Sequence, residues 1–125
     1  LVQFTLETAA VVHDIGILTA KRKHGSSAGK YQELEGPAEA KSLLSGLGWP
    51  QEVIDRVCYL VGRHHTYTNI DGPDYQILVE ADFLVNLLES DSSVQAQKNA
   101  YHNIFKTETG RRLCRLLYPI VQQET

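Results

Sequence analysis

Histidine and aspartate residues recur at three places in this sequence, each within or next to an apolar stretch typical of a helix. The set consists of His13 with Asp14, His64 with His65 directly after Arg63, and Asp82. Imidazole nitrogen and carboxylate oxygen together suit Mn, Fe, Co, Ni or Zn more than Ca. Each place also has an ordinary structural interpretation, so the chemistry depends on whether folding brings these side chains together.

The His-Asp pair lies where an apolar helical run stops. Adjacent helical residues diverge by about 100°, so His13 and Asp14 can both reach one ion only near the end of a helix. Gly16 supplies such an end. The alternative is a dipeptide at a helix C-terminus with no chemical role.

Asp82 shares a helical face with Leu78 and Val85, and this face is expected to point into the core. A carboxylate there costs free energy unless it is paired or bound to a metal. A capping or salt-bridging aspartate at the edge of the apolar stripe is the alternative. His64 and His65 end another helix, where a histidine often only offsets the helix dipole.

A basic segment follows the His-Asp pair, with the sequence KRKHGSSAGK from Lys21 to Lys30. Its charges and backbone amides could gather a phosphate, which makes Lys21, Arg22 and Lys30 candidate substrate-binding residues. The alternative is a solvated, mobile loop. The spacing of its glycines and lysines does not match a Walker phosphate-binding motif.

Helical periodicity dominates the chain, and signals for β-strands are nearly absent. We therefore expect an all-α bundle of about six helices. The boundaries that we expect are a helix over 1–15, an irregular loop over 17–35, helices starting at Pro37 and Pro50, turns over 66–74, a fourth helix around 77–88, a fifth capped by Ser92 or Ser93, and a sixth capped by Thr107 or Thr109 and ended by Pro119.

Residues 40–61, 77–88 and 101–117 are expected to supply most of the buried apolar surface. Leu43, Val57, Leu78 and Leu113 represent these inward faces, and replacing each by alanine should cost about 2–5 kcal/mol. The other positions expected to face inward are Phe4, Ala9, Val11, Val12, Ile15, Ala40, Leu44, Leu47, Val53, Ile54, Leu60, Val61, Ile77, Ala81, Val85 and Leu88, with Val94, Tyr101, Ile104, Phe105, Leu116 and Leu117 as the apolar positions of the last two helices.

Composition places the chain among ordinary globular proteins. A length of 125 residues predicts one domain, with residues 90–125 as a helical extension on the same core. A net charge of −3 gives no sign of a partner such as long nucleic acid or a membrane surface, and no apolar run is long enough for a membrane span. Two sparse cysteines, expected as buried thiols, are typical of a cytoplasmic protein.

The order of three segments resembles the HD superfamily of metal-dependent phosphohydrolases. The segments are AAVVHDIG, EGPAEAKSLLSGLGWPQEVIDRVCYLVGRHH and ILVEADFLVNL, and the resemblance covers roughly residues 5–90. The tail, with IFKTETGRRL, resembles the end of an uncharacterised bacterial subgroup of these proteins.

This resemblance implies a helical bundle that holds one or two divalent metals, with His13, Asp14 and Asp82 as ligands. His64 and His65 correspond to a later histidine position, which in some members binds a second metal and in others contacts phosphate. With Arg63, they would stabilise charge on the phosphoryl group. The metal could be Mn, Co, Ni, Fe, Zn or Mg.

Two departures from the family pattern change these expectations. No histidine precedes His13, so we expect the first family helix and its histidine to be missing from an N-terminally truncated domain. Two-metal members carry another histidine shortly before the position of Gly36, where this chain offers only Gln32 or Glu35 as imperfect substitutes. One metal is therefore favoured.

The implied function is hydrolysis of a nucleotide or another small phosphoester. The alternatives are a non-catalytic, regulatory module that binds nucleotides, and a two-iron oxygenase, which the missing second site disfavours. Because a ligand and a helix are expected to be absent, this chain should itself be weakly active or inactive. It should also expose an apolar patch near Phe4 and Val11, which a homodimer could cover.

Overall fold

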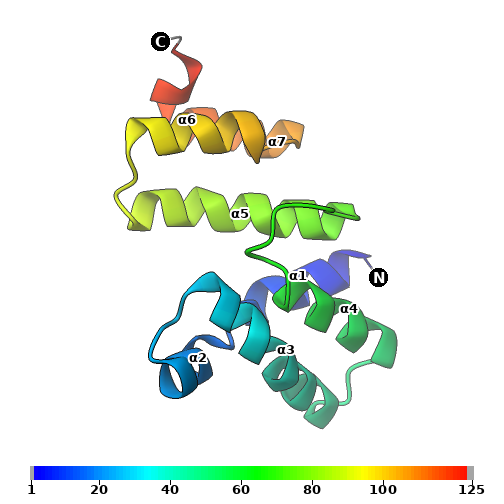
Figure 1. The fold of residues 1–125 in the computed structure, drawn as a ribbon. Helices are drawn as coiled ribbons and strands as arrows, with labels where there is room; N and C mark the ends of the chain where they lie inside the picture. The colour runs from blue at the N-terminus through cyan, green and yellow to red at the C-terminus, as the bar shows by residue number, and fades with distance from the viewer. Residues whose placement is uncertain (1, 124–125) are drawn as a thin grey trace. The chain divides into compact units, whose positions relative to one another are not determined.

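All regular structure in residues 2–123, the part of the chain that the computed structural model describes, is helical (Figure 1). The α-helices are α1 (Val2–Val12), α2 (Ile17–His24), α3 (Gly29–Gly46), α4 (Gln51–Val61), α5 (Pro73–Glu89), α6 (Val94–Asn103) and α7 (Glu108–Leu117), followed by the 3-10 helix η1 (Pro119–Gln122). The all-α prediction is confirmed, and the described residues contain seven α-helices instead of about six.

The chain divides into two compact units, which we call the first unit, through Asn69, and the second unit, from Ile70 onward. The first unit contains the first four helices, and the second contains α5 to η1. Each unit has its own buried apolar side chains, and each is described by itself below. The single-domain arrangement, with residues 90–125 on a shared core, stays a prediction.

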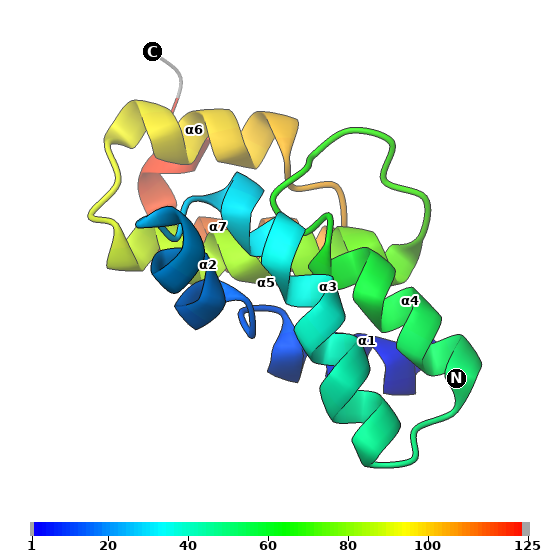
Figure 2. The same cartoon turned by 60° about the horizontal axis from the view of Figure 1, so that its bottom comes forward.

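In the first unit, α4 packs against both α1 and α3, and α2 packs along α3, as Figure 2 shows. Small residues recur every fourth position on the inner side of α3, at Gly36 and Ala40, and the stripe continues to Leu44. Such small side chains let neighbouring backbones approach closely. The buried apolar residues of this unit are Ala9, Val12, Ala20, Ala40, Leu44, Val53, Ile54, Val57, Leu60 and Val61.

The loop predicted over 17–35 is wrong, because this segment forms α2 and the first part of α3. Gly25 ends α2 in a left-handed conformation with φ 69°, and its N–H donates to the Lys21 carbonyl, so one glycine makes the turn. Pro37 lies inside α3 and does not start it. The segment has few apolar residues, so periodicity gave no signal, and part of its stability comes from pairs such as Lys23 with Glu35.

In the second unit, α5 packs against α6 and α7, and η1 packs against α6 and α7. Two predicted N-caps are confirmed: Ser93 Oγ accepts from the Ala96 amide at 3.1 Å, and Thr107 Oγ1 accepts from the Gly110 amide at 3.0 Å. The buried core here consists of Leu87, Ala100, Tyr101, Phe105, Cys114, Tyr118 and Val121.

Glu80 is a buried carboxylate, 2% exposed, that sequence reasoning missed. It accepts hydrogen bonds from the backbone amides of Lys106 and Thr107, at 3.1 and 3.0 Å, and from the Thr107 hydroxyl at 2.6 Å. The Gln76 amide donates to it as well, at 2.6 Å. A methyl group at Gly110 would lie only 1.7 Å from Glu80 Oε1, so only glycine fits there. Glu80 thus joins α5 to the start of α7.

Several helix faces that were predicted to point into the core point partly toward solvent. Val57 and Leu78 are buried as predicted, whereas Leu43 and Leu113 are 43% and 41% exposed. In α3, Leu44 takes the buried place because the Gly36–Ala40 stripe sets which side contacts α4. The other predicted inward positions that are exposed are Phe4, Val11, Leu47, Ile77, Ala81, Val85 and Leu88, and the apolar positions Val94, Leu116 and Leu117 of the last two helices are exposed as well. Exposure of Phe4 and Val11 does confirm the expected patch.

Both cysteines are free thiols, as predicted. Cys114 is buried and Cys58 is half-buried, and desolvation raises the pKa of each thiol. Among the described residues, we find no helix with the length and apolar character that crossing a membrane requires.

The rotation of α3 can be tested with neighbouring leucines. Leu44→Ala should lower the free energy of unfolding by about 2–5 kcal/mol, because it empties a buried position. Leu43→Ala should cost less than about 1 kcal/mol, because that side chain is already half in water. Chemical denaturation monitored by circular dichroism measures both, and equal losses would contradict this orientation of α3.

A second stability prediction concerns Glu80. Glu80→Ala leaves two backbone N–H groups and a hydroxyl without their acceptor, at about 1–3 kcal/mol for each buried group, so we expect a loss of roughly 2–4 kcal/mol. The matched control is Glu89→Ala on the exposed end of the same helix, which should change stability by less than about 0.5 kcal/mol. A Glu80 variant as stable as the control would show that these hydrogen bonds contribute nothing.

Candidate metal centre

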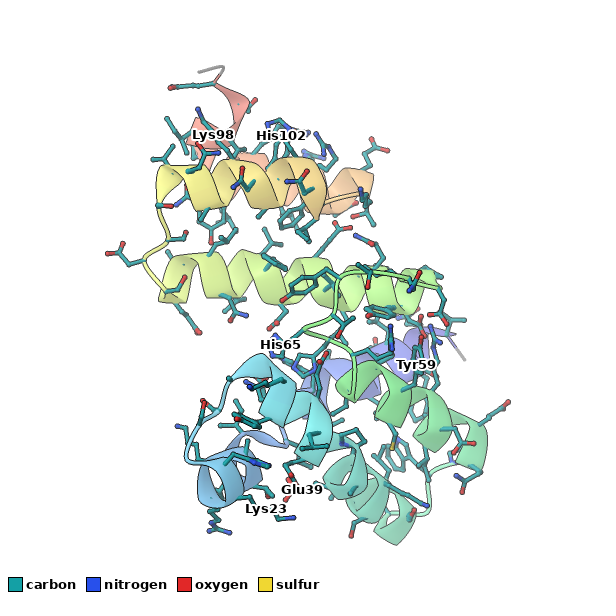
Figure 3. The ribbon with its side chains drawn as sticks, viewed as in Figure 1. Lys23, Glu39, Tyr59, His65, Lys98 and His102 are labelled. Atoms are coloured by element: carbon teal, nitrogen blue, oxygen red, sulfur yellow. The ribbon has the colours of Figure 1, made fainter. Side chains whose placement is uncertain are left out.

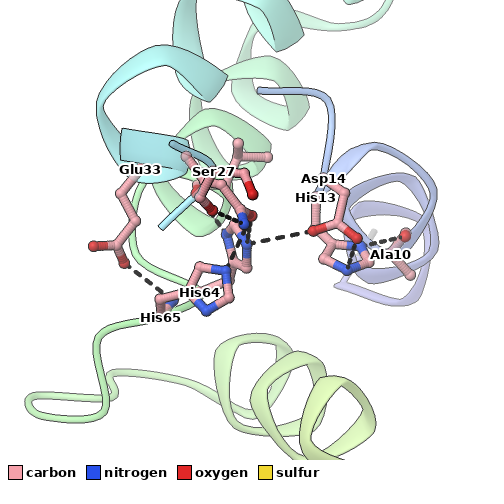
Figure 4. Close-up of polar contacts among 9 residues, drawn as sticks. Ala10, His13, Asp14, Ser27, Glu33, His64 and His65 are labelled. Atoms are coloured by element: carbon pink, nitrogen blue, oxygen red, sulfur yellow. Dashed lines mark hydrogen bonds and ion pairs between the residues drawn. The ribbon is translucent and has the colours of Figure 1, made fainter. Parts of the chain in front are cut away.

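Folding brings Asp14, His64 and His65 together within the first unit (Figure 4). Asp14 lies in the turn after α1, and the two histidines follow the end of α4. One ligand atom from each lies within 4.8 Å of the other two. First-row metals hold ligands at about 2.0–2.2 Å, so two ligand atoms of one ion are at most about 4.4 Å apart. Three ligands of one ion lie closer together, at about 3.3–3.8 Å in tetrahedral or trigonal geometry, so a shared ion would draw these atoms together by up to about 1.5 Å.

His64 is fully buried and held in one orientation. Its Nδ1 lies 2.7 Å from the Val61 carbonyl oxygen, so Nδ1 carries a hydrogen and donates it. The opposite nitrogen, Nε2, lies 3.8 Å from Asp14 Oδ1 and 3.3 Å from Gln32 Oε1. A ring nitrogen fixed to a backbone carbonyl is the usual arrangement behind a metal-binding histidine.

Gln32 presents its oxygen to both histidines. Its Nε2 donates to the Ser27 carbonyl at 2.7 Å, which assigns the amide orientation and leaves Oε1 facing the imidazoles. Oε1 lies 3.3 Å from His64 Nε2 and 3.0 Å from His65 Nε2. Gln32 and Glu35 were the two residues that could stand in place of the histidine that binds a second metal in some family members. Of these two, Gln32 lies at the site.

Glu35, the other substitute, is engaged elsewhere on α3. Its carboxylate contacts His24 Nε2 at 2.8 Å and Lys23 Nζ at 3.2 Å, both on α2. The hydrogen bond from His24, and then that from Lys23, holds the pKa of Glu35 below its ordinary value. Glu35 therefore stabilises the contact between α2 and α3 and does not reach the histidine pair.

The atoms that converge at this site are oxygens and imidazole nitrogens, the types that can bind a cation. Asp14 Oδ1 and Gln32 Oε1 accept hydrogen bonds, and both face His64 Nε2, whose ring has already placed a hydrogen on Nδ1. The donor set of nitrogen and oxygen suits a first-row divalent ion.

His13 borders the same group. Its Nδ1 donates to the Ala10 carbonyl at 2.8 Å, and its Nε2 lies 3.2 Å from Asp14 Oδ2. Its ring meets the His64 ring edge-on, with centroids 5.4 Å apart. The two carboxylate oxygens of Asp14 are therefore divided between His64 and His13.

Glu33 fixes the turn that carries the histidine pair, and nothing in the sequence marked it. Its carboxylate accepts from the His65 backbone amide at 3.0 Å and from the Thr66 hydroxyl at 2.8 Å. Consecutive residues Gln32 and Glu33 on α3 thus contact the side chain and the backbone of His65, respectively.

Close glycine contacts let α3 approach both halves of the site. A methyl group at Gly16 would lie 2.8 Å from the Gly36 Cα and N atoms, and one at Gly36 would lie 2.6 Å from Val61 Cγ1. At the start of α3, a methyl group at Gly29 would lie 2.9 Å from His65 Cβ. Any larger side chain at these positions would push α3 away from the Asp14 turn or from the histidine pair.

Asp82 and Arg63 are the two other predicted site residues outside the basic segment. Asp82 is on α5 in the second unit and is partly buried, so its approach to Asp14 stays a prediction. The Arg63 guanidinium lies over the Tyr59 ring, 5.3 Å from its centroid.

The three basic candidates belong to two helices and not to one loop. Lys21 and Arg22 are exposed on α2. Lys30 is exposed at the start of α3, with its Nζ 4.9 Å from the centroid of the Tyr31 ring. Lys30 directly follows Gly29, which contacts His65, so it is the basic candidate next in sequence to the site.

Comparison of this chain with protein-family models, with curated proteins and with solved structures found no match. The candidate metal centre described above therefore rests on the geometry of the first unit. The HD-superfamily assignment rests on the motifs in the sequence and stays a prediction.

Gly16→Ala tests whether the close approach of α3 holds the site together. Gly16 has φ −81°, which alanine adopts freely, so any penalty must come from the contact with the Gly36 backbone. We expect a loss of about 1–3 kcal/mol in the free energy of unfolding. Gly46→Ala, where no atom lies within 4 Å of the added methyl group, should instead stabilise the protein by up to about 1 kcal/mol. Two variants of equal stability would show that the Gly16 contact is not tight.

Proposed function

We propose that this chain carries the metal centre of a metal-dependent phosphohydrolase that acts on a nucleotide or another small phosphoester, and that the chain by itself turns substrate over slowly. The observation that carries the proposal is the convergence of Asp14, His64 and His65, with their ligand atoms within 4.8 Å of one another. The motif order that resembles the HD superfamily supports it from the sequence side, because the same residues belong to those motifs.

The proposed ligands are Asp14, His64 and His65, with Gln32 as a neutral oxygen donor in the same group. The resemblance adds His13 and Asp82. A divalent cation at this position polarises a phosphoryl oxygen and makes a neighbouring water more acidic. Mn, Fe, Co, Ni and Zn suit this mixture of nitrogen and oxygen better than Ca does.

Asp14 and His13 would orient the attacking water and take up its proton. The Asp14 side chain is 51% exposed, so a substrate and a water can reach it from solvent. Its Oδ2, which faces His13 Nε2 at 3.2 Å, is placed to accept a hydrogen bond from an attacking water. His13 keeps its hydrogen on Nδ1, so its Nε2 can take up a proton beside that carboxylate.

A lysine on α3 would interact with the negative charge of the substrate. Lys30 follows Gly29, whose backbone contacts His65, and is exposed to solvent. A lysine there can reach the negative charge of a phosphoester bound at the histidine pair. We therefore assign the substrate-binding role to Lys30 before Lys21 and Arg22, which lie on α2.

Turnover with a matched pair of variants tests the function. Phosphate release from nucleotides and simple phosphoesters should depend on added Mn, Co, Ni or Zn and should fall at least 100-fold in Asp14→Asn, which removes a charged ligand. The control is Asp55→Asn on the exposed side of α4, which should keep wild-type activity.

Two results would decide against hydrolysis. Nucleotides that raise the melting temperature equally with and without metal, and are not turned over, would indicate a non-catalytic binding module. Metal affinity that is unchanged in Asp14→Asn by isothermal titration calorimetry would show that the ion does not use this site.

A further inference from the structure

A polar hollow lies in the second unit, and none of the residues that the proposed function uses lines it. It measures about 740 Å³ and is bounded by α6, by the end of α7 and by η1. This size falls within the range of about 300–1,000 Å³ that small-molecule sites occupy. The side chains that matter most are Lys98, Asn99, His102, Arg115 and Gln122.

Helical spacing gathers one wall of the hollow. Gln95, Lys98, Asn99 and His102 recur at the three- and four-residue intervals that place side chains on one face of α6. Figure 3 shows Lys98 and His102 along one side of this helix. Arg115 approaches from α7, so cationic groups enter the hollow from two helices.

The hollow carries positive charge, and its described lining residues include no negative charge to balance it. Lys98 and Arg115 are both half-buried, and none of the described lining residues is acidic. This contrasts with the whole chain, whose net charge is −3. Partly desolvated cations in a concave surface focus a field that attracts anions.

Arg115 is held in place by a neutral partner. Its Nη1 donates to the Tyr101 hydroxyl at 2.9 Å, and Tyr101 itself belongs to the buried core. Arg111 lies over the Tyr101 ring, 4.1 Å from its centroid, and donates to the carbonyls of Tyr101 and Phe105. The contacts described for these two guanidinium groups therefore position them without neutralising their charge.

We propose that this hollow binds a phosphate-bearing small molecule, as a ligand site independent of the metal centre. Arg115 supplies a planar fork of donors for phosphate oxygens, and Lys98 supplies a point charge. Asn99 and Gln122 offer neutral amide donors around the rest of the ligand. The proposal concerns binding alone and includes no chemical step.

The test uses the whole chain with pyrophosphate as the probe, in EDTA and about 0.15 M salt so that metal chemistry is absent. Amide NMR signals of α6 and η1 should shift in a saturable way, with a Kd below about 1 mM. Lys98→Gln and Arg115→Gln should each raise that Kd at least tenfold. The matched controls are Lys106→Gln and Arg112→Gln, which are exposed and do not line the hollow.

Several outcomes would overturn the proposal. If the control variants weaken pyrophosphate binding as much as Lys98→Gln does, binding reflects general attraction between opposite charges and does not depend on the hollow. Binding of a single-stranded oligonucleotide without any binding of pyrophosphate would make the hollow part of a nucleic-acid surface. Because Lys98→Gln leaves the Tyr101 contacts intact, it decides the matter even if Arg115→Gln fails to fold. Asp14→Asn should bind pyrophosphate normally, which separates this site from the proposed hydrolase site.

Discussion

The backbone contact between Gly16 and Gly36 determines how the first unit is built. Asp14 and the histidine pair lie 50 residues apart in sequence, as the numbers of Asp14 and His64 show, and they meet because both pack against α3. A methyl group at Gly16 would lie 2.8 Å from the α3 backbone, so the turn that carries Asp14 approaches this helix as closely as two backbones can. On the other side, α3 meets Val61 and the turn that follows α4. One helix with small residues along its inner side therefore sets the separation of the acidic and imidazole groups.

This geometry has an electrostatic consequence. Carboxylate, amide and imidazole acceptors converge, and the hydrogen bond from His64 Nδ1 to the Val61 carbonyl turns Nε2 toward them. Each of these groups gives up water as the chain folds, which costs stability unless the group is paired. Gln32 and Glu33 reduce that cost by bonding the side chain and backbone of His65. A cation bound at this site, as we propose, would offset it further.

The sequence allowed us to predict features that depend only on neighbouring residues, such as helix caps. Ser93 and Thr107 were identified as caps because a hydroxyl can reach an amide three residues ahead. The helix predicted over 1–15 with its end at Gly16 already ends at Val12, and Gly16 lies at the start of α2. Sequence reasoning missed α2 and the start of α3, where polar pairs replace apolar periodicity. It also placed Leu43, Leu44 and Leu47 on one inward face, of which only Leu44 is buried. It also missed Glu33 and Glu80, since each accepts hydrogen bonds from backbone more than 20 residues away. Only the folded chain shows such partners.

Anomalous X-ray diffraction from crystals grown with cobalt or manganese measures the central claim most directly, because it locates the ion independently of activity. The account predicts a peak about 2.0–2.3 Å from Asp14 Oδ1 and from the Nε2 atoms of His64 and His65. It also predicts that His64 Nδ1 keeps its bond to the Val61 carbonyl in that crystal. Ordered side chains in the arrangement described here, with no anomalous peak among them at saturating metal, would contradict the metal centre.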